Sequence, residues 1–440
     1  MVVVGLGTSG VAAARLCLRR GARVIATDAK ASSSVGAPAL ALSKEGVELA
    51  LGGHDTVDFG AADVVVVSPG VPSFASLEAA ERAGVPVVGE VELAVGELAR
   101  PAAVVAIGGT NGKSTVTSLL GAIFAAAGKR TFVGGNLGEP LAEHVDEAWD
   151  VVVLEVSSFQ MERVRTFKPR ASVLLNVTPD HLDRYPSVEA YARAKGNAFL
   201  RQDENDLAIV PHGDAVCLAE ARRGNARVAT FGPGGAVDVK DGEVRDTRTG
   251  ARYPRALFGI QGGHNALNIA AAIGACGDMD VSPDVIAHVV REFRGLPHRM
   301  ALVRNVGGVR YYDDSKGTNV GASVTALRGI AESKAVLICG GRDKGGSYAP
   351  LVEALREKGR AAVLIGEAAD VIANAIGSVV PVRRARTLAE AVHTSAELAH
   401  AGDAVLLSPA CSSFDMFKDY KHRGEEFVRA VNEIPEKGER

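Results

Sequence analysis

The chain carries the stretch Ile107-Gly-Gly-Thr-Asn-Gly-Lys-Ser-Thr115, which follows an apolar run, 102–107, and precedes a helical pattern, 116–127. This order predicts a phosphate cradle: a strand, a glycine-rich loop, a lysine, a hydroxyl and a helix. In such a cradle, the loop N–H groups and the helix N-terminus face the bound phosphate. Lys113 can reach the outer phosphates, and the Ser114 hydroxyl can bind Mg²⁺. The strict P-loop pattern has glycine where Ile107 stands, so this is a variant P-loop. A tight turn without a ligand is the weaker alternative.

Composition limits the classes of protein that the chain can represent. Its 440 residues predict two to four domains, and 47% hydrophobic residues are enough for globular cores. A net charge of −3 without a Lys/Arg-rich run argues against nucleic acid as the main partner. Apolar runs fall far short of the ~18 residues of a membrane helix, so we expect no membrane insertion.

The cysteines favour a reducing compartment. The five are scattered and form no Cys-x-x-Cys pair: Cys17, Cys217, Cys276, Cys339 and Cys411. This pattern argues against a disulfide framework and against a zinc site, and it favours the cytoplasm.

Alternating strand and helix signals divide the chain into three α/β blocks with parallel sheets. The expected strands are 2–4, 23–26, 63–67, 102–107, 151–155, 171–176, 309–312, 335–339, 361–365 and 404–407, with a helix over 11–20 and an Ala-rich helix opening at 264–268. Residues 203–258 are rich in Gly, Asp and Arg, and we interpret them as irregular strands and turns at the periphery. Ligand-bearing strand ends in all three blocks predict a site in the clefts between them.

A second glycine-rich loop, Gly5-Leu-Gly7-Thr-Ser-Gly10, follows the first expected strand and opens a helix. Asp28 lies near the end of the next strand, which completes a pattern typical of dinucleotide sites. A nicotinamide dehydrogenase is the obvious reading, but it leaves the P-loop unexplained. The loop can instead hold another pyrophosphate, such as that of a UDP-linked substrate, or it can be a close-packed turn.

Polar residues follow the buried strands of the second block. Glu155 ends one strand, where an acid in P-loop enzymes completes the Mg²⁺ shell. Asn176, Asp180 and His181 follow the next strand, which places His181 where a metal ligand can sit. Lys195, on an expected helix, is by itself an ordinary solvated lysine.

Further polar residues extend the same ligand edge. Asn265 and Asn268 share one face of a helix, where amides can read an adenine edge or cap the helix. The third block adds polar clusters after its strands, at His298-Arg299, 313–319, 340–344 and 408–413. Such clusters bind phosphate, ribose or carboxylate, although Ser315 or Thr318 can also serve as a helix N-cap.

In order along nearly the whole chain, these motifs resemble the Mur ligase family. The residues that carry the resemblance are Gly109-Thr-Asn-Gly-Lys-Ser-Thr115, Gly134-Gly-Asn136, Leu154-Glu-Val-Ser-Ser-Phe-Gln160, Asp180-His-Leu-Asp-Arg-Tyr185, His264-Asn265, Gly295-Leu-Pro-His-Arg299, Asp314-Ser-Lys-Gly-Thr-Asn319, Ser408-Pro-Ala-Cys-Ser-Ser-Phe-Asp415 and Phe417-Lys-Asp-Tyr-Lys-His-Arg-Gly424. The variant P-loop belongs to this family's pattern, and the stretch from Ser408 is typical of its members that add D-glutamate.

The resemblance implies an α/β fold of three domains. It implies a Rossmann-like N-terminal domain over 1–90 that binds the UDP end of a substrate, and a central P-loop ATPase-type domain with a mostly parallel sheet over 91–295. A Rossmann-like C-terminal domain over 296–440 would bind the amino acid. The implied activity is ATP-dependent amide ligation of D-glutamate to UDP-N-acetylmuramoyl-L-alanine in peptidoglycan synthesis, through an acyl phosphate and a tetrahedral intermediate, by a cytoplasmic monomer.

The resemblance also implies roles for particular residues. ATP would be held by Gly108, Gly109, Thr110, Asn111, Gly112, Lys113, Ser114, Thr115, Asn268, Arg299, Asp314 and Lys316. The UDP-linked substrate would be held by Gly7, Thr8, Ser9, Asp28, Ser68 and Asn136, and D-glutamate by Thr318, Lys344, Ser413 and Tyr420. Lys113, Glu155, His181 and Lys195 would be catalytic.

Two Mg²⁺ ions are implied as well, one on Ser114 and Glu155 and the other on His181 and Lys195. In the family the lysine matching Lys195 is carbamylated, which turns a cation into an anion and requires a neutral amine, favoured by burial and a nearby cation. Ala29-Lys30 depart from the family's uracil pocket, which often has Thr and Arg there. The alternatives are another amide ligase of the superfamily, such as a different Mur ligase or a folylpolyglutamate synthase, the dehydrogenase, and a non-catalytic nucleotide-binding regulator.

Overall fold

A computed structural model describes residues 1–435. The chain forms two compact units, and each is described by itself. The first unit comprises 1–177, 189–255 and 268–290, and the second comprises 178–188, 256–267 and the chain from 291 onward.

The first unit contains a five-stranded parallel sheet in the order β3-β2-β1-β4-β5. Its strands are β1 (Val2–Val4), β2 (Ile25–Asp28), β3 (Glu48–Leu51), β4 (Val65–Val67) and β5 (Val87–Gly89), and its helices are α1 (Thr8–Arg19), α2 (Ala37–Glu45), α3 (Ala75–Arg82) and α4 (Glu90–Gly96). Successive side chains of a strand point to opposite faces. Val3 therefore packs with α1 and α2, whereas Val2 and Val4 pack with α3. Helices on both faces explain why the central strands β1 and β4 are continuous runs of valine.

The nine-stranded sheet of the first unit has β6 next to β8 and β9, in the order β14-β13-β12-β11-β10-β9-β6-β8-β7. Its strands are β6 (Ala103–Gly108), β7 (Thr131–Gly135), β8 (Val151–Glu155), β9 (Ala171–Leu174), β10 (Leu207–Pro211), β11 (Arg227–Phe231), β12 (Val237–Lys240), β13 (Glu243–Asp246) and β14 (Arg252–Pro254). The strands from β7 to β12 are parallel, and β12 to β14 are antiparallel.

The helical elements along this part of the chain are α5 (Lys113–Ala126), η1 (Leu141–Glu143), α6 (Ser158–Met161), α7 (Val188–Gly196), η2 (Asn197–Phe199), α8 (Ala215–Ala221), η3 (Arg255–Leu257), α9 (Gly263–Ala275) and α10 (Pro283–Glu292). The expectation of irregular peripheral structure over 203–258 is wrong for β10. This strand pairs in parallel with β9, and four of its five residues are buried. The edge position that we expected holds for β12 to β14.

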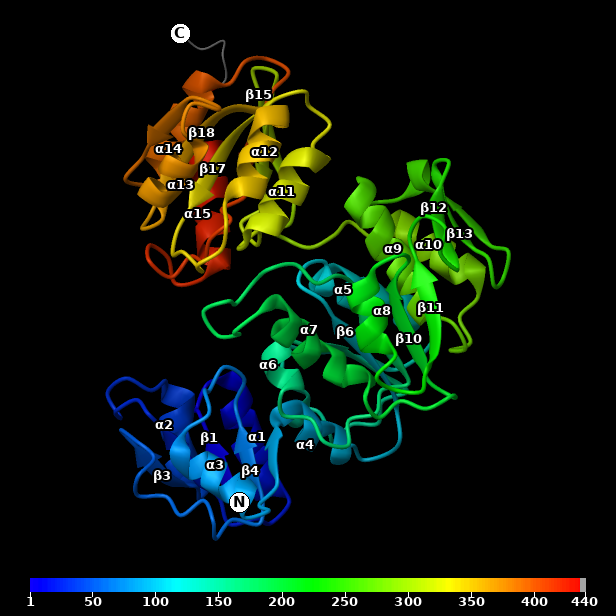
Figure 1. Ribbon diagram of the computed structural model, residues 1–440, viewed down its shortest axis with the longest axis vertical. Coiled ribbons are helices and arrows are strands. Elements are labelled where there is room, and N and C mark those ends of the chain that lie inside the picture. Colours follow the sequence, from blue (N-terminus) through cyan, green and yellow to red (C-terminus); the bar gives the residue numbers. More distant parts are fainter. Residues whose placement is uncertain (436–440) are drawn as a thin grey trace. The chain divides into compact units, whose positions relative to one another are not determined.

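The second unit contains a six-stranded sheet in the order β15-β16-β20-β17-β18-β19, antiparallel only between β15 and β16. Its strands are β15 (Ala301–Val306), β16 (Val309–Asp313), β17 (Ala335–Gly340), β18 (Gly359–Ile365), β19 (Val382–Arg384) and β20 (Ala404–Leu407), and its helices are α11 (Val320–Gly329), α12 (Ala349–Lys358), α13 (Ala369–Ile376), α14 (Leu388–Leu398) and α15 (Tyr420–Asn432). Figure 1 shows α11 and α12 on one side of β17 and α14 on the other.

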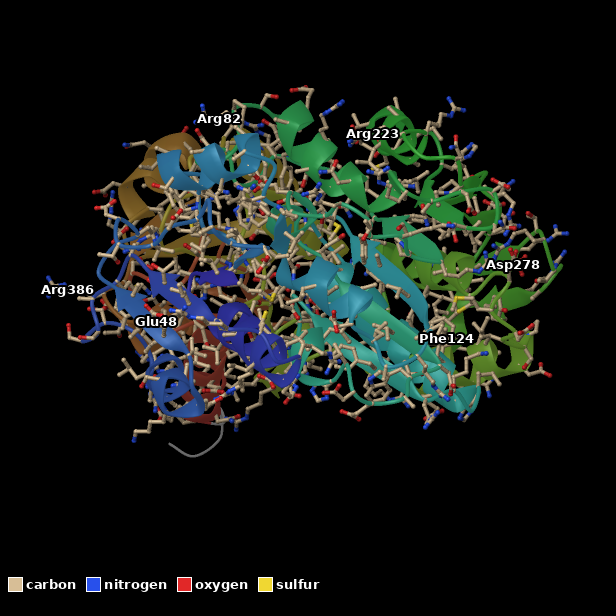
Figure 2. The ribbon with its side chains drawn as sticks, turned by 90° about the horizontal axis from the view of Figure 1, so that it is seen from below. Glu48, Arg82, Phe124, Arg223, Asp278 and Arg386 are labelled. Carbon is tan, nitrogen blue, oxygen red and sulfur yellow. The ribbon has the colours of Figure 1, made fainter. Side chains whose placement is uncertain are left out.

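These observations confirm the expected fold class, three α/β sheets covered by helices, of which the central one is mostly parallel. The charged residues Glu48, Arg82 and Asp278, labelled in Figure 2, are exposed, whereas Phe124 of α5 is completely buried. All five cysteines are free and buried. Within residues 1–435, no helix is both long enough and apolar enough to cross a membrane.

Candidate active site

The P-loop connects β6 to α5, and its shape depends on two glycines with positive φ. Gly109 has φ +138° and Gly112 has φ +86°. A Cβ on Gly112 would lie 2.5 Å from Oδ1 of Asn268, so only glycine fits where that amide packs. The Asn176 side chain holds the loop by accepting from the Asn111 N–H at 2.9 Å and donating to the Asn111 carbonyl at 3.1 Å.

Two lysine ammonium groups point at the P-loop backbone. Lys113 Nζ donates to the carbonyls of Gly109 and Thr110, both at 2.9 Å. Lys195 Nζ donates to the same Gly109 carbonyl at 2.8 Å and lies 4.4 Å from the centre of the Tyr191 ring. Only 4% of Lys195 is exposed, so this is not the solvated helical lysine that its sequence setting suggests. Together with the N-terminus of α5, these cations make the loop attractive to a polyphosphate.

Glu155 joins the P-loop to the end of the neighbouring strand β7. The Ser114 hydroxyl donates to Glu155 Oε2 at 2.5 Å, and Asn136 Nδ2 donates to Glu155 Oε1 at 2.6 Å. A hydroxyl, a carboxylate and an amide are the oxygen ligands that Mg²⁺ prefers, so this set fits the ion. Among the residues that the structure describes, no group of three or more His, Cys, Asp and Glu is arranged to hold a metal. A metal here would therefore depend on a mixed set of oxygen donors.

A pocket of about 320 Å³ lies beside this cluster in the same unit. It is lined by Gly7, Thr8, Ser9, Ser68, Pro69, Gly135, Asn136, Gly138, Pro140 and Gln160. Five of the six residues expected to hold the UDP-linked substrate are in this lining. The other five lining residues were not predicted as substrate contacts: Pro69, Gly135, Gly138, Pro140 and Gln160. Gly135 and Gln160 nevertheless lie within the 134–136 and 154–160 motifs, whereas no motif marks Gly138 and Pro140.

Asp28 is the sixth of those residues, and its carboxylate holds the glycine-rich loop. Asp28 Oδ2 accepts a hydrogen bond from the Leu6 N–H at 2.7 Å, and Oδ1 accepts from the Lys30 N–H at 2.9 Å. Ser68 also holds this loop, because its hydroxyl donates to the Gly5 carbonyl at 2.7 Å. Asp28 is thus brought to the loop but is absent from the residues that line the pocket.

In the second unit, Asp314 lies at the end of β16. It is buried, and its Oδ2 accepts from the Ser408 hydroxyl at 2.7 Å. Burial raises the pKa of Asp314 to about 7, against the lowering effects of Ser408 and of the Arg299 charge. Lys316 lies two residues further on, with its ammonium group 3.8 Å from the centre of the Tyr420 ring. The unit therefore places a cation, an aromatic ring and a buried acid together.

Asp180 links His181 to the residues expected to receive the amino acid. Its Oδ1 lies 3.4 Å from Lys344 Nζ, and its Oδ2 accepts from Asn319 Nδ2 at 3.2 Å and lies 3.8 Å from His181 Nε2. Burial acts to raise the pKa of Asp180, but the charges of Lys344 and His181 prevail and lower it. His181 has φ +55°, a conformation unusual for a residue with a side chain.

Arg423 lies within the Phe417–Gly424 motif, but our sequence reasoning gave it no role. It is completely buried, and it donates to Ser315 Oγ at 3.0 Å and to the Ser315 carbonyl at 2.8 Å. Burial lowers its pKa to about 10. An arginine in a polar helix start gives no sequence signal of burial.

Two of the residues expected to bind D-glutamate are held by backbone hydrogen bonds. Ser413 is buried, and its carbonyl accepts from the Phe417 N–H at 2.8 Å. The Thr318 N–H donates to the Lys316 carbonyl at 2.8 Å.

The predicted site residues thus fall into two groups. The first unit brings together the P-loop residues Gly108–Thr115, Asn136, Glu155, Lys195 and Asn268, with Gly7, Thr8, Ser9 and Ser68 in the adjoining pocket. The second unit contains His181, Arg299, Asp314, Lys316, Thr318, Lys344, Ser413 and Tyr420.

Three family models match the chain in order. They are the Mur ligase MurD-like N-terminal domain over residues 1–89, the Mur ligase middle domain over 107–276 and the Mur ligase glutamate ligase domain over 298–411. The UDP-N-acetylmuramoylalanine–D-glutamate ligase of Geobacter metallireducens is 46% identical over 443 residues, which cover 99% of this chain and 97% of that protein. The enzyme of the same name from Trichlorobacter lovleyi is 43% identical over 98% of each chain.

Solved structures resemble the chain at lower identity. UDP-N-acetylmuramate-alanine ligase MurC from Thermotoga maritima matches with a TM-score of 0.62 and 19% identity, covering 98% of each chain. MurF ligase from Thermotoga maritima in complex with ADP matches with a TM-score of 0.64 and 17% identity, covering 93% of this chain and 95% of that one. Identities this low support the fold alone.

Proposed function

Because this chain belongs to the Mur ligase family, we propose that it joins D-glutamate to UDP-N-acetylmuramoyl-L-alanine with conversion of ATP to ADP and phosphate. ATP is the nucleotide of this family, and the product is a precursor of peptidoglycan. The division into domains over 1–90, 91–295 and 296–440, the cytoplasmic location and the monomeric state belong to the same proposal.

One structural observation carries the assignment of the reaction centre. Asn136 lines the 320 Å³ pocket and also donates to Glu155, which in turn accepts from Ser114 of the P-loop. The pocket and the phosphate cradle are therefore connected by two hydrogen bonds, from Asn136 to Glu155 and from Ser114 to Glu155. A carboxylate that projects from a UDP-linked substrate in this pocket would lie close to the terminal phosphate of ATP on the loop, as phosphoryl transfer requires.

The reaction then has three steps. The alanine carboxylate oxygen attacks the γ-phosphorus of ATP, the bond from that phosphorus to the bridging oxygen breaks, and ADP leaves with an acyl phosphate formed. The D-glutamate amine, once it has lost a proton, attacks the acyl carbon and forms a tetrahedral intermediate. Collapse of this intermediate expels phosphate and leaves the amide. Lys113 and the loop N–H groups stabilise the charge that the phosphoryl group carries in transfer.

Mg²⁺ bound to Ser114 and Glu155 would offset the repulsion between a carboxylate and a polyphosphate. His181 and Lys195 would hold a second ion, with Lys195 as a carbamate. Burial of Lys195 beside the second lysine, Lys113, favours the neutral amine from which a carbamate forms. Asn268, Arg299, Asp314 and Lys316 would bind the rest of ATP, and Thr318, Lys344, Ser413 and Tyr420 would bind D-glutamate.

The experiment that tests this function measures phosphate release from ATP. The protein is given UDP-N-acetylmuramoyl-L-alanine with D-glutamate, with L-glutamate or with neither. Release that requires both the UDP-linked substrate and D-glutamate supports the proposal. Release with L-glutamate or another amino acid points to a sister amide ligase, and release in no combination points to a nucleotide-binding regulator.

A further inference from the structure

Glu90 is a buried acid that the proposed reaction does not use. It is the first residue of α4, directly after β5, and only 1% of it is exposed. Its Oε1 accepts a hydrogen bond from the Ala142 N–H at 2.9 Å, across 52 residues of sequence. Its Oε2 is buried without a hydrogen-bond partner among the described residues. Burying a carboxylate costs free energy unless hydrogen bonds compensate for the lost water. The hydrogen bond from the Ala142 N–H is therefore the feature of Glu90 that needs a structural explanation.

The partner of Glu90 belongs to the wall of the substrate pocket. Ala142 is the middle residue of η1, which begins immediately after Pro140, and both Gly138 and Pro140 line the pocket. The Ala142 carbonyl accepts from Arg19 Nη2 at 2.5 Å. One peptide segment is therefore bound on its N–H side by Glu90 of α4 and on its carbonyl side by Arg19 of α1. Helix α1 starts at Thr8, which also lines the pocket.

The surroundings of Glu90 are mainly apolar. Leu141 and Ala142 pack with Leu16 of α1 and with Val91 and Ala94 of α4 in one buried cluster. The charged groups at this junction come from three segments. They are Glu92 of α4 and Glu97 directly after it, Arg15 and Arg19 of α1 and Arg20 directly after it, and Glu143, His144 and Asp146 of η1 and its continuation. Burial raises the pKa of Glu90 to about 7, its bond to Ala142 lowers it, and the Glu143 charge raises it.

We propose that Glu90 is a positioning residue for the UDP-linked substrate, because it fixes η1 and thereby the Gly138–Pro140 wall of the pocket against α1. This inference rests on the proposed function for the identity of the ligand. Without the Glu90 acceptor, the Ala142 N–H would lose its partner in an apolar interface, and the wall would no longer be held in one position. The side chains that bind the Ala142 peptide group belong to Glu90 and Arg19, which are not residues of the phosphate cradle, so we expect nucleotide affinity not to change.

The test compares Glu90→Met with Glu90→Gln by calorimetric titration of UDP-N-acetylmuramoyl-L-alanine and, separately, of ADP. Methionine keeps the volume but removes the acceptor, and the amide oxygen of glutamine keeps it. We expect Glu90→Met to bind the UDP-linked substrate about tenfold more weakly than the wild type, with unchanged ADP affinity. Glu90→Gln should bind the UDP-linked substrate with the affinity of the wild type. Melting temperatures show that each variant is folded.

A second pair of variants keeps the question answerable if Glu90→Met does not fold. Arg19→Met removes the other bond to Ala142 from a partly exposed side chain, and Arg23→Met, at a side chain that is 85% exposed, is the matched control. Arg19→Met should weaken binding of the UDP-linked substrate, and Arg23→Met should not.

Unchanged binding in both Glu90→Met and Arg19→Met overturns the inference, as does an equal loss of substrate and ADP affinity, which indicates a general structural role. Wild-type protein that binds ADP but not the UDP-linked substrate overturns the proposed function itself. If the wild type binds the UDP-linked substrate and the variants bind it equally well, only the role of Glu90 is overturned.

Discussion

The hydroxyl of Ser114 and the carboxylate of Glu155 lie 2.5 Å apart, although they come from α5 and β8, 41 residues apart in the sequence. β8 pairs in parallel with β6, the strand that leads into the P-loop, so the polar ends of both strands come to one edge of the sheet. The amide of Asn136, at the end of β7, binds the other Glu155 oxygen. The ends of three neighbouring strands, β6, β8 and β7, thus bring one set of oxygen ligands together beside the phosphate cradle.

Glu155→Gln tests whether this set binds Mg²⁺. The substitution keeps the shape of the side chain and removes its charge, so the Mg²⁺ concentration for half-maximal phosphate release should rise by at least about tenfold. Glu204→Gln, at an exposed position, is the control and should leave that concentration unchanged. Equal Mg²⁺ requirements in the two variants would remove Glu155 from the metal site.

Lys113→Ala should reduce turnover by about 10²- to 10³-fold or more, because the transferring phosphoryl group loses a charge partner. Folding should be retained, since the carbonyls of Gly109 and Thr110 that accept from Lys113 Nζ belong to the same loop as the lysine. Initial rates and melting temperatures are measured beside Lys44→Ala, an exposed lysine. A rate near that of the wild type would overturn the role of Lys113.

Lys195→Ala should be nearly inactive and partly rescued by a small carboxylate or a bicarbonate-like anion, which can replace the carbamate. The anion should not rescue Lys113→Ala, whose missing group is a cation, so that variant is the control. Rates across an anion titration provide the measurement, and identical anion responses in the two variants would contradict the carbamate proposal.

Asp314 predicts a pH dependence of stability. Its pKa rises from the ordinary value of 3.8 to about 7 on folding, because of burial. The stability associated with its proton is therefore fully present below about pH 4, and it is lost as pH rises through 7. Asp314→Asn should abolish this part of the dependence, so its free energy of unfolding should fall less between pH 5 and 8, by no more than about 3 kcal/mol for the two pH units below the folded pKa. Denaturant unfolding at both pH values measures it, and equal slopes in the two proteins would contradict the burial effect.

The sequence predicted the elements that carry strong local signals. Runs such as Val2–Val4 and Val151–Glu155 form buried strands because apolar residues fill both faces of a parallel sheet. Boundaries were less accurate. Helix α1 begins at Thr8 rather than Val11, because the glycine-rich loop turns directly into the helix. β10 was missed because Asp203, Glu204 and Asp206 precede its five residues and hide a buried strand in a polar stretch.

The candidate site was predictable where chemistry is local in the sequence, as in the P-loop and at Glu155. It was not predictable where a residue acts through distant contacts. The hydrogen bond that Asp28 accepts from the Leu6 N–H and the burial of Glu90 against Ala142 are two such contacts. Such contacts arise only when the sheets pack, and no residue spacing encodes them.

The close packing of Gly112 against Asn268 has a consequence for the order in which the chain can fold during synthesis. In the sheet, β6 lies between β8 and β9. The loop after β6 is hydrogen-bonded to Asn176, and Gly112 of this loop packs against the side-chain amide of Asn268, 156 positions further along the sequence. A nascent chain that has just exposed the loop from the ribosome therefore lacks the groups that shape it. The full set of contacts that shapes the nucleotide loop can form only after the chain has been synthesised as far as Asn268.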